Sequence, residues 1–284
     1  MKNLIIRALT GVLFLVVMIG CMTWTPLSFA LLFLVITTLS IWEFSGLVNM
    51  SEGVDLNRHI TTAAGAYLFV AFFSMGAGVG GVRLLPLLFL PWIITIVYLF
   101  ISELYLEREN PLNNWAYTVW SQVYVALPFG LLSLLFFSHG WFIPLAVFIF
   151  LWCSDTGAYC TGSLIGRHRL FPRISPKKSW EGSIGGGVLA VVASQVIAWC
   201  GPETTIDGVT TVFGLTALQW AGFALVVVVF GTWGDLVESL LKRQLGVKDS
   251  GNILPGHGGM LDRFDSSLLA IPAATAYLYT LYLL

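Results

Sequence analysis

The segment from Lys242 to Ser266 holds an unusual concentration of side chains that can do chemistry. Three of its carboxylates, Asp249, Asp262 and Asp265, are hard oxygen ligands of the type that Mg²⁺ prefers. Four basic side chains in the same segment can hold phosphate oxygens: Lys242, Arg243, Lys248 and Arg263. Because acids, bases and glycines gather in one short segment, the pattern favours a metal–polyphosphate site over a plain connection between helices.

The glycines of this segment surround a single histidine. Gly258 and Gly259 allow backbone N–H groups to approach a ligand closely. His257, between Gly256 and Gly258, is compatible with a turn residue, a donor to a phosphate, or an acid or base near neutral pH. The sequence holds no paired His or Cys set for zinc and no GxxxxGK[ST] loop, so neither zinc chemistry nor a P-loop nucleotidase is supported.

A second basic segment lies at residues 167–178 and leads into another run of glycines. Lys177, Lys178 and Ser179 come just before an apolar stretch, where a helix N-terminus would present free N–H groups to an anion. We therefore interpret these three residues as candidate phosphate contacts. The bases from Arg167 to Arg173 are equally typical of a loop beside anionic lipid headgroups.

Several acids stand inside apolar stretches, where an ionised carboxylate near the membrane centre costs about 3 kcal/mol. Asp155, Asp235 and Glu238 must therefore face a wet cavity, a base or a metal, or lie closer to the membrane surface than these spans place them. We interpret Asp235 as functional. Glu238 is compatible with a function or with an interfacial salt bridge to Lys242, four residues later. Glu43 is interpreted as structural, either reaching the interface or pairing with a nearby arginine.

The rest of the chain must position these residues in a membrane. Of its 284 residues, 57% are hydrophobic and only 10% are charged, whereas about 25% are charged in a typical soluble domain. We predict an all-α polytopic membrane protein, because lipid offers no partner for the backbone polar groups of other structures. About nine transmembrane helices are expected, at residues 4–22, 26–48, 60–80, 84–104, 118–138, 141–162, 184–200, 214–240 and 267–284.

The orientation follows from the distribution of Lys and Arg. With a cytoplasmic N-terminus and an outside C-terminus, 13 of the 14 basic residues lie in cytoplasmic segments, and only Arg83 lies outside. The stretch from Pro202 to Phe213 has acids but no base, which fits an outside loop. The N-terminal apolar run resembles a signal peptide, but another run follows at once, so a retained first span is predicted.

We predict a single membrane domain, 1–284, whose two halves differ in style. Residues 1–140 are predicted to be a transmembrane scaffold in which we find no chemistry. Residues 141–284 are predicted to be the catalytic region. Its cytoplasmic loops would be 163–183 and 241–266.

Four motifs together resemble one enzyme family. The longest runs from Ser239 through the bases and acids of the first segment to LPGHGGMLDRFD at 254–265. It resembles the signature of the phosphatidate cytidylyltransferases, also called CDP-diacylglycerol synthases, without a departure. SDTGAY at 154–159, SPKKSWEG at 175–182 and GDLVES at 234–239 are similar to the same family. The first half of the chain resembles it only in being hydrophobic and multi-span.

The resemblance implies that CTP and phosphatidic acid react at the cytoplasmic membrane face to give CDP-diacylglycerol and pyrophosphate, for phospholipid biosynthesis. It implies Mg²⁺ held by Asp235 and Asp262, with Asp155 as a weaker ligand, and room for a second cation such as K⁺. The implied catalytic residues are Asp235, Asp262, Asp265, Lys248, Asp249, His257 and Arg263. The implied substrate-binding residues are Lys177, Lys178, Ser179, Lys242, Arg243, Gly258 and Gly259.

The same resemblance implies a homodimer in contact with membrane lipid, with no nucleic-acid partner, in the bacterial cytoplasmic (inner) membrane. Two other classes stay open. A secondary transporter would also use intramembrane acids, although here the polar residues cluster at one membrane face. Another lipid nucleotidyl- or phosphotransferase, such as a polyprenol kinase, is the second alternative, although the long signature favours cytidylyl transfer.

Overall fold

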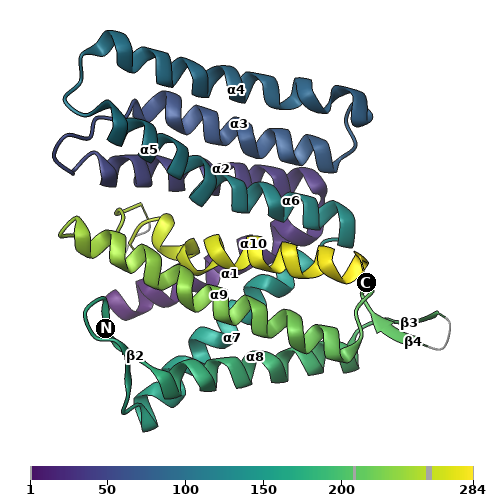
Figure 1. Cartoon of the computed structure of the whole chain (residues 1–284). Helices are drawn as coiled ribbons and strands as arrows, with labels where there is room; N and C mark the ends of the chain where they lie inside the picture. Colours follow the sequence, from purple (N-terminus) through teal and green to yellow (C-terminus); the bar gives the residue numbers. More distant parts are fainter. Residues whose placement is uncertain (1, 207–208, 254–257, 284) are drawn as a thin grey trace. The chain divides into compact units, whose positions relative to one another are not determined.

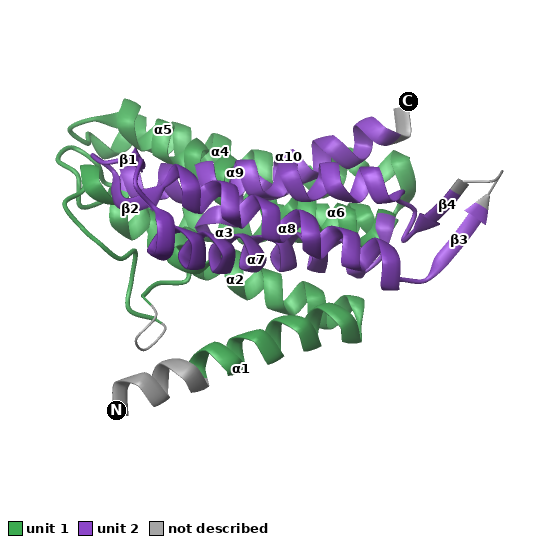
Figure 2. Ribbon diagram, turned by 90° about the horizontal axis from the view of Figure 1, so that it is seen from below, with its two compact units in different colours: residues 1–138, 242–264 green, residues 139–241, 265–284 purple. Residues whose placement is uncertain are grey.

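The computed structural model describes residues 2–206, 209–253 and 258–283, and the chain forms two compact units (Figure 2). The first unit contains residues 1–138 and 242–264, and the second contains 139–241 and 265–284. Among the described residues, seven helices are long and apolar enough to cross a membrane, which confirms the multi-pass helical prediction. The count of nine stays a prediction, because the first and last helices are not in that set. The orientation of the termini also stays a prediction, because length and composition do not determine it.

Apart from residues 242–264, the first unit consists of helices that follow one another along the chain. Its helices are α1 (Lys2–Trp24), α2 (Pro26–Val48), α3 (Arg58–Gly76), α4 (Gly81–Leu106), α5 (Pro111–Ser121), a π-helical segment (Gln122–Ala126) and α6 (Leu127–His139) (Figure 1). Helix α2 begins at a capping box, in which Thr25 and Ser28 each bond the other's backbone N–H. Neighbouring helices pack in the order α1, α2, α3, α4. The buried rings of Phe29, Phe33 and Phe129 form a contiguous core between α2 and α6.

The second unit combines helices with two short hairpins. Its elements are α7 (Phe142–Ile165), β1 (Arg169–Phe171), β2 (Ser175–Ser179), α8 (Trp180–Cys200), β3 (Glu203–Ile206), β4 (Val209–Val212) and most of α9 (Ala217–Gln244) and α10 (Leu261–Leu283). Helices α7 and α8 approach closely at glycines: a Cβ on Gly157 would lie 2.9 Å from the Cα of Gly186.

The segments predicted as loops at 163–183 and 202–213 contain antiparallel strand pairs, which were not predicted from the sequence.

Candidate active site

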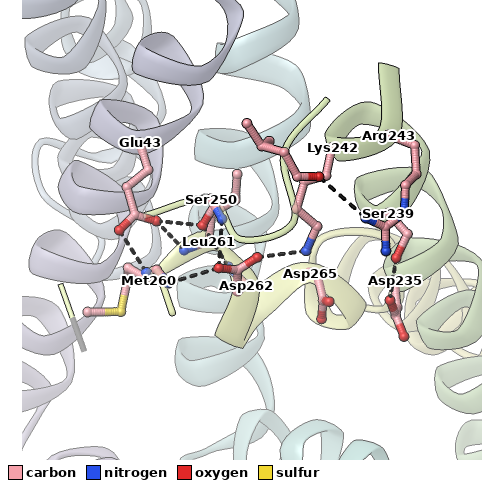
Figure 3. A network of polar contacts seen from close by, with 12 residues as sticks. Glu43, Asp235, Ser239, Lys242, Arg243, Ser250, Met260, Leu261, Asp262 and Asp265 are labelled. Atoms are coloured by element: carbon pink, nitrogen blue, oxygen red, sulfur yellow. Dashed lines mark hydrogen bonds and ion pairs between the residues drawn. The ribbon is translucent and has the colours of Figure 1, made fainter. Parts of the chain in front are cut away.

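In the first unit, three donors hold the carboxylate of Asp262 (Figure 3). The Nζ atom of Lys242 lies 2.6 Å from Oδ1, and the backbone nitrogens of Ser250 and Gly259 each lie 2.8 Å from Oδ2. The side chains of Asp262 and Lys242 are only 7% and 12% exposed. Burial acts to raise the pKa of Asp262, but the bonds from Lys242, Gly259 and Ser250 outweigh it, so the pKa lies below its usual value. Asp262 is therefore a fixed, ionised carboxylate.

The local backbone explains how Asp262 reaches this position. Helix α9 ends at Gln244, and Gly246 follows in the left-handed region with φ of 69° and donates to the carbonyl of Arg243. Gly258 also has a positive φ, 82°, and a Cβ there would lie 2.8 Å from Asp262 Oδ2. The predicted glycines at 258 and 259 thus shape the surroundings of Asp262, and their contact with a phosphate stays a prediction.

Sequence reasoning missed the part played by Glu43. This residue of α2 is 4% exposed, and its carboxylate accepts hydrogen bonds from Ser250 Oγ at 2.9 Å, Met260 N at 2.9 Å and Leu261 N at 2.8 Å. All three donors belong to the segment that carries the family-like signature (Figure 3). The signal was available, because Glu43 is an acid in an apolar stretch, and the cost argument applied to Asp235 applies to it equally.

In the second unit, Asp235 of α9 connects two of the motifs found in the sequence, residues 234–239 and 175–182. Its Oδ2 atom forms an ion pair with the Nζ atom of Lys178 on β2, and its Oδ1 atom accepts a hydrogen bond of 3.1 Å from Ser239 Oγ. The side chains of Asp235 and Lys178 are 26% and 27% exposed, so water reaches the pair. Asp235 therefore faces a base, as the cost of an acid in an apolar stretch requires.

A cavity of about 550 Å³ lies in the same unit. Its lining includes five charged or hydroxyl side chains from α7, α8 and the first hairpin: Asp155, Arg169, Lys177, Lys178 and Ser183. Ser179 also lines the cavity, but its Oγ accepts a hydrogen bond of 3.1 Å from the backbone of Gly182 and so caps the N-terminus of α8. The predicted bases of the second segment therefore stand beside a space that can take a ligand.

A second residue that the sequence did not single out holds the first hairpin in place. Glu181, in the first turn of α8, accepts hydrogen bonds of 3.2 Å from the backbone nitrogens of Arg167 and His168. Its Oε1 atom also lies 2.6 Å from His168 Nδ1. Glu181 thereby ties the start of the hairpin that carries Lys177 and Lys178.

The other predicted residues lie at several places in the two units. Asp265 lies in the second unit, where its Oδ1 atom accepts a hydrogen bond of 2.5 Å from the backbone of Ser266. Arg243 Nη1 lies 3.4 Å from the carbonyl oxygen of Val247. Three predicted residues of the first unit are exposed to solvent: Lys248, Asp249 and Arg263. His257 lies outside the described residues.

The fold and the site define a helical, multi-pass membrane protein in which lysines and carboxylates meet beside glycine-rich turns, an arrangement suited to phosphate chemistry. The chain belongs to the cytidylyltransferase family, whose model matches residues 5–281. It is 31% identical over 275 residues to a phosphatidate cytidylyltransferase of Haemophilus influenzae, covering 92% of this chain and 93% of that protein. It is 40% identical over 161 residues to the protein of that name in Staphylococcus aureus, covering 55% of this chain and 56% of that protein. The family predicted from the signature is thereby confirmed.

Proposed function

We propose that the chain transfers the cytidylyl group of CTP to phosphatidic acid, giving CDP-diacylglycerol and pyrophosphate. The observation that carries this proposal is the alignment with the H. influenzae phosphatidate cytidylyltransferase over nearly the whole of both chains. The ion pairs of Asp235 and Asp262 with lysines support it. The reaction joins two polyanions, so it needs positive charge to hold the phosphates and carboxylates to hold a cation.

The reaction needs little covalent chemistry from the protein. A phosphate oxygen of phosphatidic acid attacks the α-phosphorus of CTP and forms a new P–O bond. The bond from the α-phosphorus to the bridging oxygen breaks, and its electron pair leaves with pyrophosphate. Because the attacking oxygen is already anionic, no strong base has to remove a proton. The protein's task is to bring the two anions together and to stabilise the charge that develops on the leaving group.

The basic residues beside the cavity fit this task. Arg169, Lys177 and Lys178 line a space of about 550 Å³ in the second unit, where they can bind phosphate oxygens by charge-assisted hydrogen bonds. In the first unit, Lys242 has its ammonium group on Asp262 and can contact a phosphate oxygen from the same position. These lysines hold the substrates by charge, and the cap formed by Ser179 keeps the start of α8 beside the cavity.

The residues also fit a divalent cation that is held partly by the protein and partly by the substrate. Mg²⁺ usually binds through one or two carboxylates together with water and substrate phosphates, and seldom in an all-protein cage. Asp235 and Asp262 are carboxylates of this kind, and each lies beside a lysine that can hold a phosphate oxygen. Asp235 and Asp262 would hold Mg²⁺ with support from Asp155, and a second cation such as K⁺ belongs to the same proposal. When bound, Mg²⁺ neutralises phosphate charge and polarises the phosphoryl group under attack.

We place the reaction at the cytoplasmic face of a bacterial inner membrane, with the N-terminus inside and the enzyme as a homodimer. The uneven distribution of Lys and Arg supports the orientation, and the bacterial origin of the relatives supports the membrane. CTP arrives there from water, while phosphatidic acid stays in its leaflet. Both substrates therefore meet without either crossing the membrane.

The direct test uses purified protein in detergent with phosphatidic acid in mixed micelles, labelled CTP and Mg²⁺. We expect label to enter the organic phase in step with pyrophosphate release, to stop with EDTA, and to be lost in Asp235→Asn. A folded wild-type protein that forms neither product would refute the proposal. Substrate flux in proteoliposomes would then test the transporter alternative.

A further inference from the structure

We infer that Glu43 is a positioning residue for this reaction, and that its carboxylate fixes the turn that presents Asp262. The inference rests on the proposed function and adds to it, because it gives the N-terminal helices a part in the catalytic geometry. Both residues belong to the first unit, in which Glu43 lies on α2 and Asp262 in the first turn of α10.

The contacts of Glu43 and Asp262 pass through the same few atoms (Figure 3). Ser250 links the two carboxylates, because its Oγ donates to Glu43 at 2.9 Å while its backbone N–H donates to Asp262 at 2.8 Å. The same Oγ accepts from the backbone nitrogen of Asp262 at 3.3 Å. Glu43 also accepts from Leu261 N at 2.8 Å, one residue before Asp262. A displacement of Glu43 therefore moves both the backbone and the hydrogen-bond donors of Asp262.

The space around Glu43 is shaped to its carboxylate. A Cβ on Gly251 would lie 2.6 Å from Glu43 Oε1, and a Cβ on Gly259 would overlap both Glu43 Oε2 and Ser250 Oγ. Both glycines belong to the signature segment, and Gly259 also donates its N–H to Asp262. The turn can therefore approach Glu43 this closely only because both positions are glycine.

Only a carboxylate satisfies all the donors that meet here. The backbone N–H groups of Met260 and Leu261 are at the N-terminus of α10, where the helix itself supplies no acceptor. The two oxygens of Glu43 accept from these groups and from Ser250, and the negative charge suits this end of a helix. In Glu43→Gln one oxygen becomes an NH₂ group, which cannot accept, so at least one donor loses its partner.

The chain offers a matched control in Glu103 of α4. Glu103 is 7% exposed and also lies in the first unit, but its carboxylate accepts from Arg108 at 2.6 Å and Asn114 at 2.8 Å. Those partners join helices of the scaffold and are outside the signature segment. Glu103→Gln therefore removes a buried carboxylate of the same unit without disturbing the turn at Asp262.

The test compares wild type, Glu43→Gln and Glu103→Gln in the micelle assay, with Mn²⁺ binding followed separately by the EPR signal of free Mn²⁺. We expect Glu43→Gln to lower kcat by about 10–100-fold and to weaken Mn²⁺ binding about 10-fold, as for other residues that orient a ligand, while KM for phosphatidic acid stays within about threefold. Glu103→Gln should keep both kcat and Mn²⁺ binding within about twofold of wild type. Equal losses in the two variants, or unchanged Mn²⁺ binding in Glu43→Gln, would overturn the inference.

A second variant keeps the test decisive if Glu43→Gln does not fold. Ser250→Ala leaves the bonds from Met260 and Leu261 to Glu43. It removes the Oγ atom, which donates to Glu43 and accepts from the backbone nitrogen of Asp262 and so links the two residues. We expect the same pattern, a lower kcat and weaker Mn²⁺ binding, and a wild-type result in both readouts would overturn the inference. If the wild-type protein makes no CDP-diacylglycerol, the proposed function fails, and the Mn²⁺ measurement still decides the role of Glu43.

Discussion

Asp262→Asn and Asp235→Asn should both lower turnover by more than about 100-fold, but only Asp262→Asn should destabilise the protein strongly. The two carboxylates differ in their surroundings. The side chain of Asp262 is 7% exposed and accepts from Lys242 and two backbone nitrogens, whereas the side chains of Asp235 and its partner Lys178 are 26% and 27% exposed. Burial and the number of donors therefore set the two variants apart.

The expected magnitudes follow from these environments. Removing one partner of a buried ion pair costs about 3–5 kcal/mol, and we take about 3 kcal/mol for Asp262→Asn because Lys242 keeps 12% exposure. The pair of Asp235 with Lys178 is hydrated, and such pairs contribute about 0.2–1 kcal/mol. At roughly 2–4 °C per kcal/mol for a chain of this size, Asp262→Asn should lower Tm by about 6–12 °C and Asp235→Asn by less than about 4 °C.

The assay is thermal unfolding in one detergent at one scan rate, since membrane proteins often unfold irreversibly and apparent Tm values depend on that rate. Turnover is measured on the same preparations well below Tm, where both variants should lose more than about 100-fold. If Asp262→Asn unfolds within about 2 °C of wild type, or if Asp235→Asn is the less stable of the two, the link between burial and stability drawn here is wrong.

Three further substitutions test other parts of the structure. Gly259→Ala should lower stability by about 1–3 kcal/mol, because its Cβ would overlap Glu43 and Ser250, and an unchanged Tm would contradict this close packing. Ser179→Ala should cost about 1 kcal/mol through loss of the cap at the N-terminus of α8, which a denaturation curve would show as a lower midpoint. Arg83→Ala, at an exposed position, should keep turnover within about twofold, and a folded but inactive variant would place the site at the opposite membrane face.

Much of the fold follows from the sequence because the membrane constraint is strong. Long apolar stretches have to become helices, since lipid leaves backbone polar groups no other partner, and the predicted spans coincide with helices of the structure. The strands at 169–171 and 175–179 were not predicted, because their segment is polar and short and has no alternating pattern. The π-helical segment at 122–126 also leaves no trace in hydropathy, which averages over a whole span.

The parts of the candidate site that could be predicted are those whose residues lie close together in the sequence. The signature segment and the lysines at 177 and 178 were found because their residues are close in the sequence. Glu43 was interpreted as structural, and its contacts with the signature segment were not predicted, because its partners lie 207–218 residues away along the chain and no local pattern connects them. Ser179 was expected to bind substrate, and its cap to Gly182 shows that a hydroxyl before a helix has a structural use that spacing alone does not distinguish.

The lysine partners explain how this chain carries one acid in an apolar stretch, Asp235, and one that is buried, Asp262. An ionised carboxylate in an apolar environment is costly without an opposite charge, and here Asp235 and Asp262 each have a lysine ammonium within ion-pair distance. In the proposed site the same lysines would attract a polyphosphate, so an arriving anion and the carboxylate would compete for one ammonium group. A cation that takes the lysine's place on the carboxylate would release the ammonium toward the phosphate. Substrate and cation should therefore favour each other's binding, because each relieves the charge that the other leaves uncompensated.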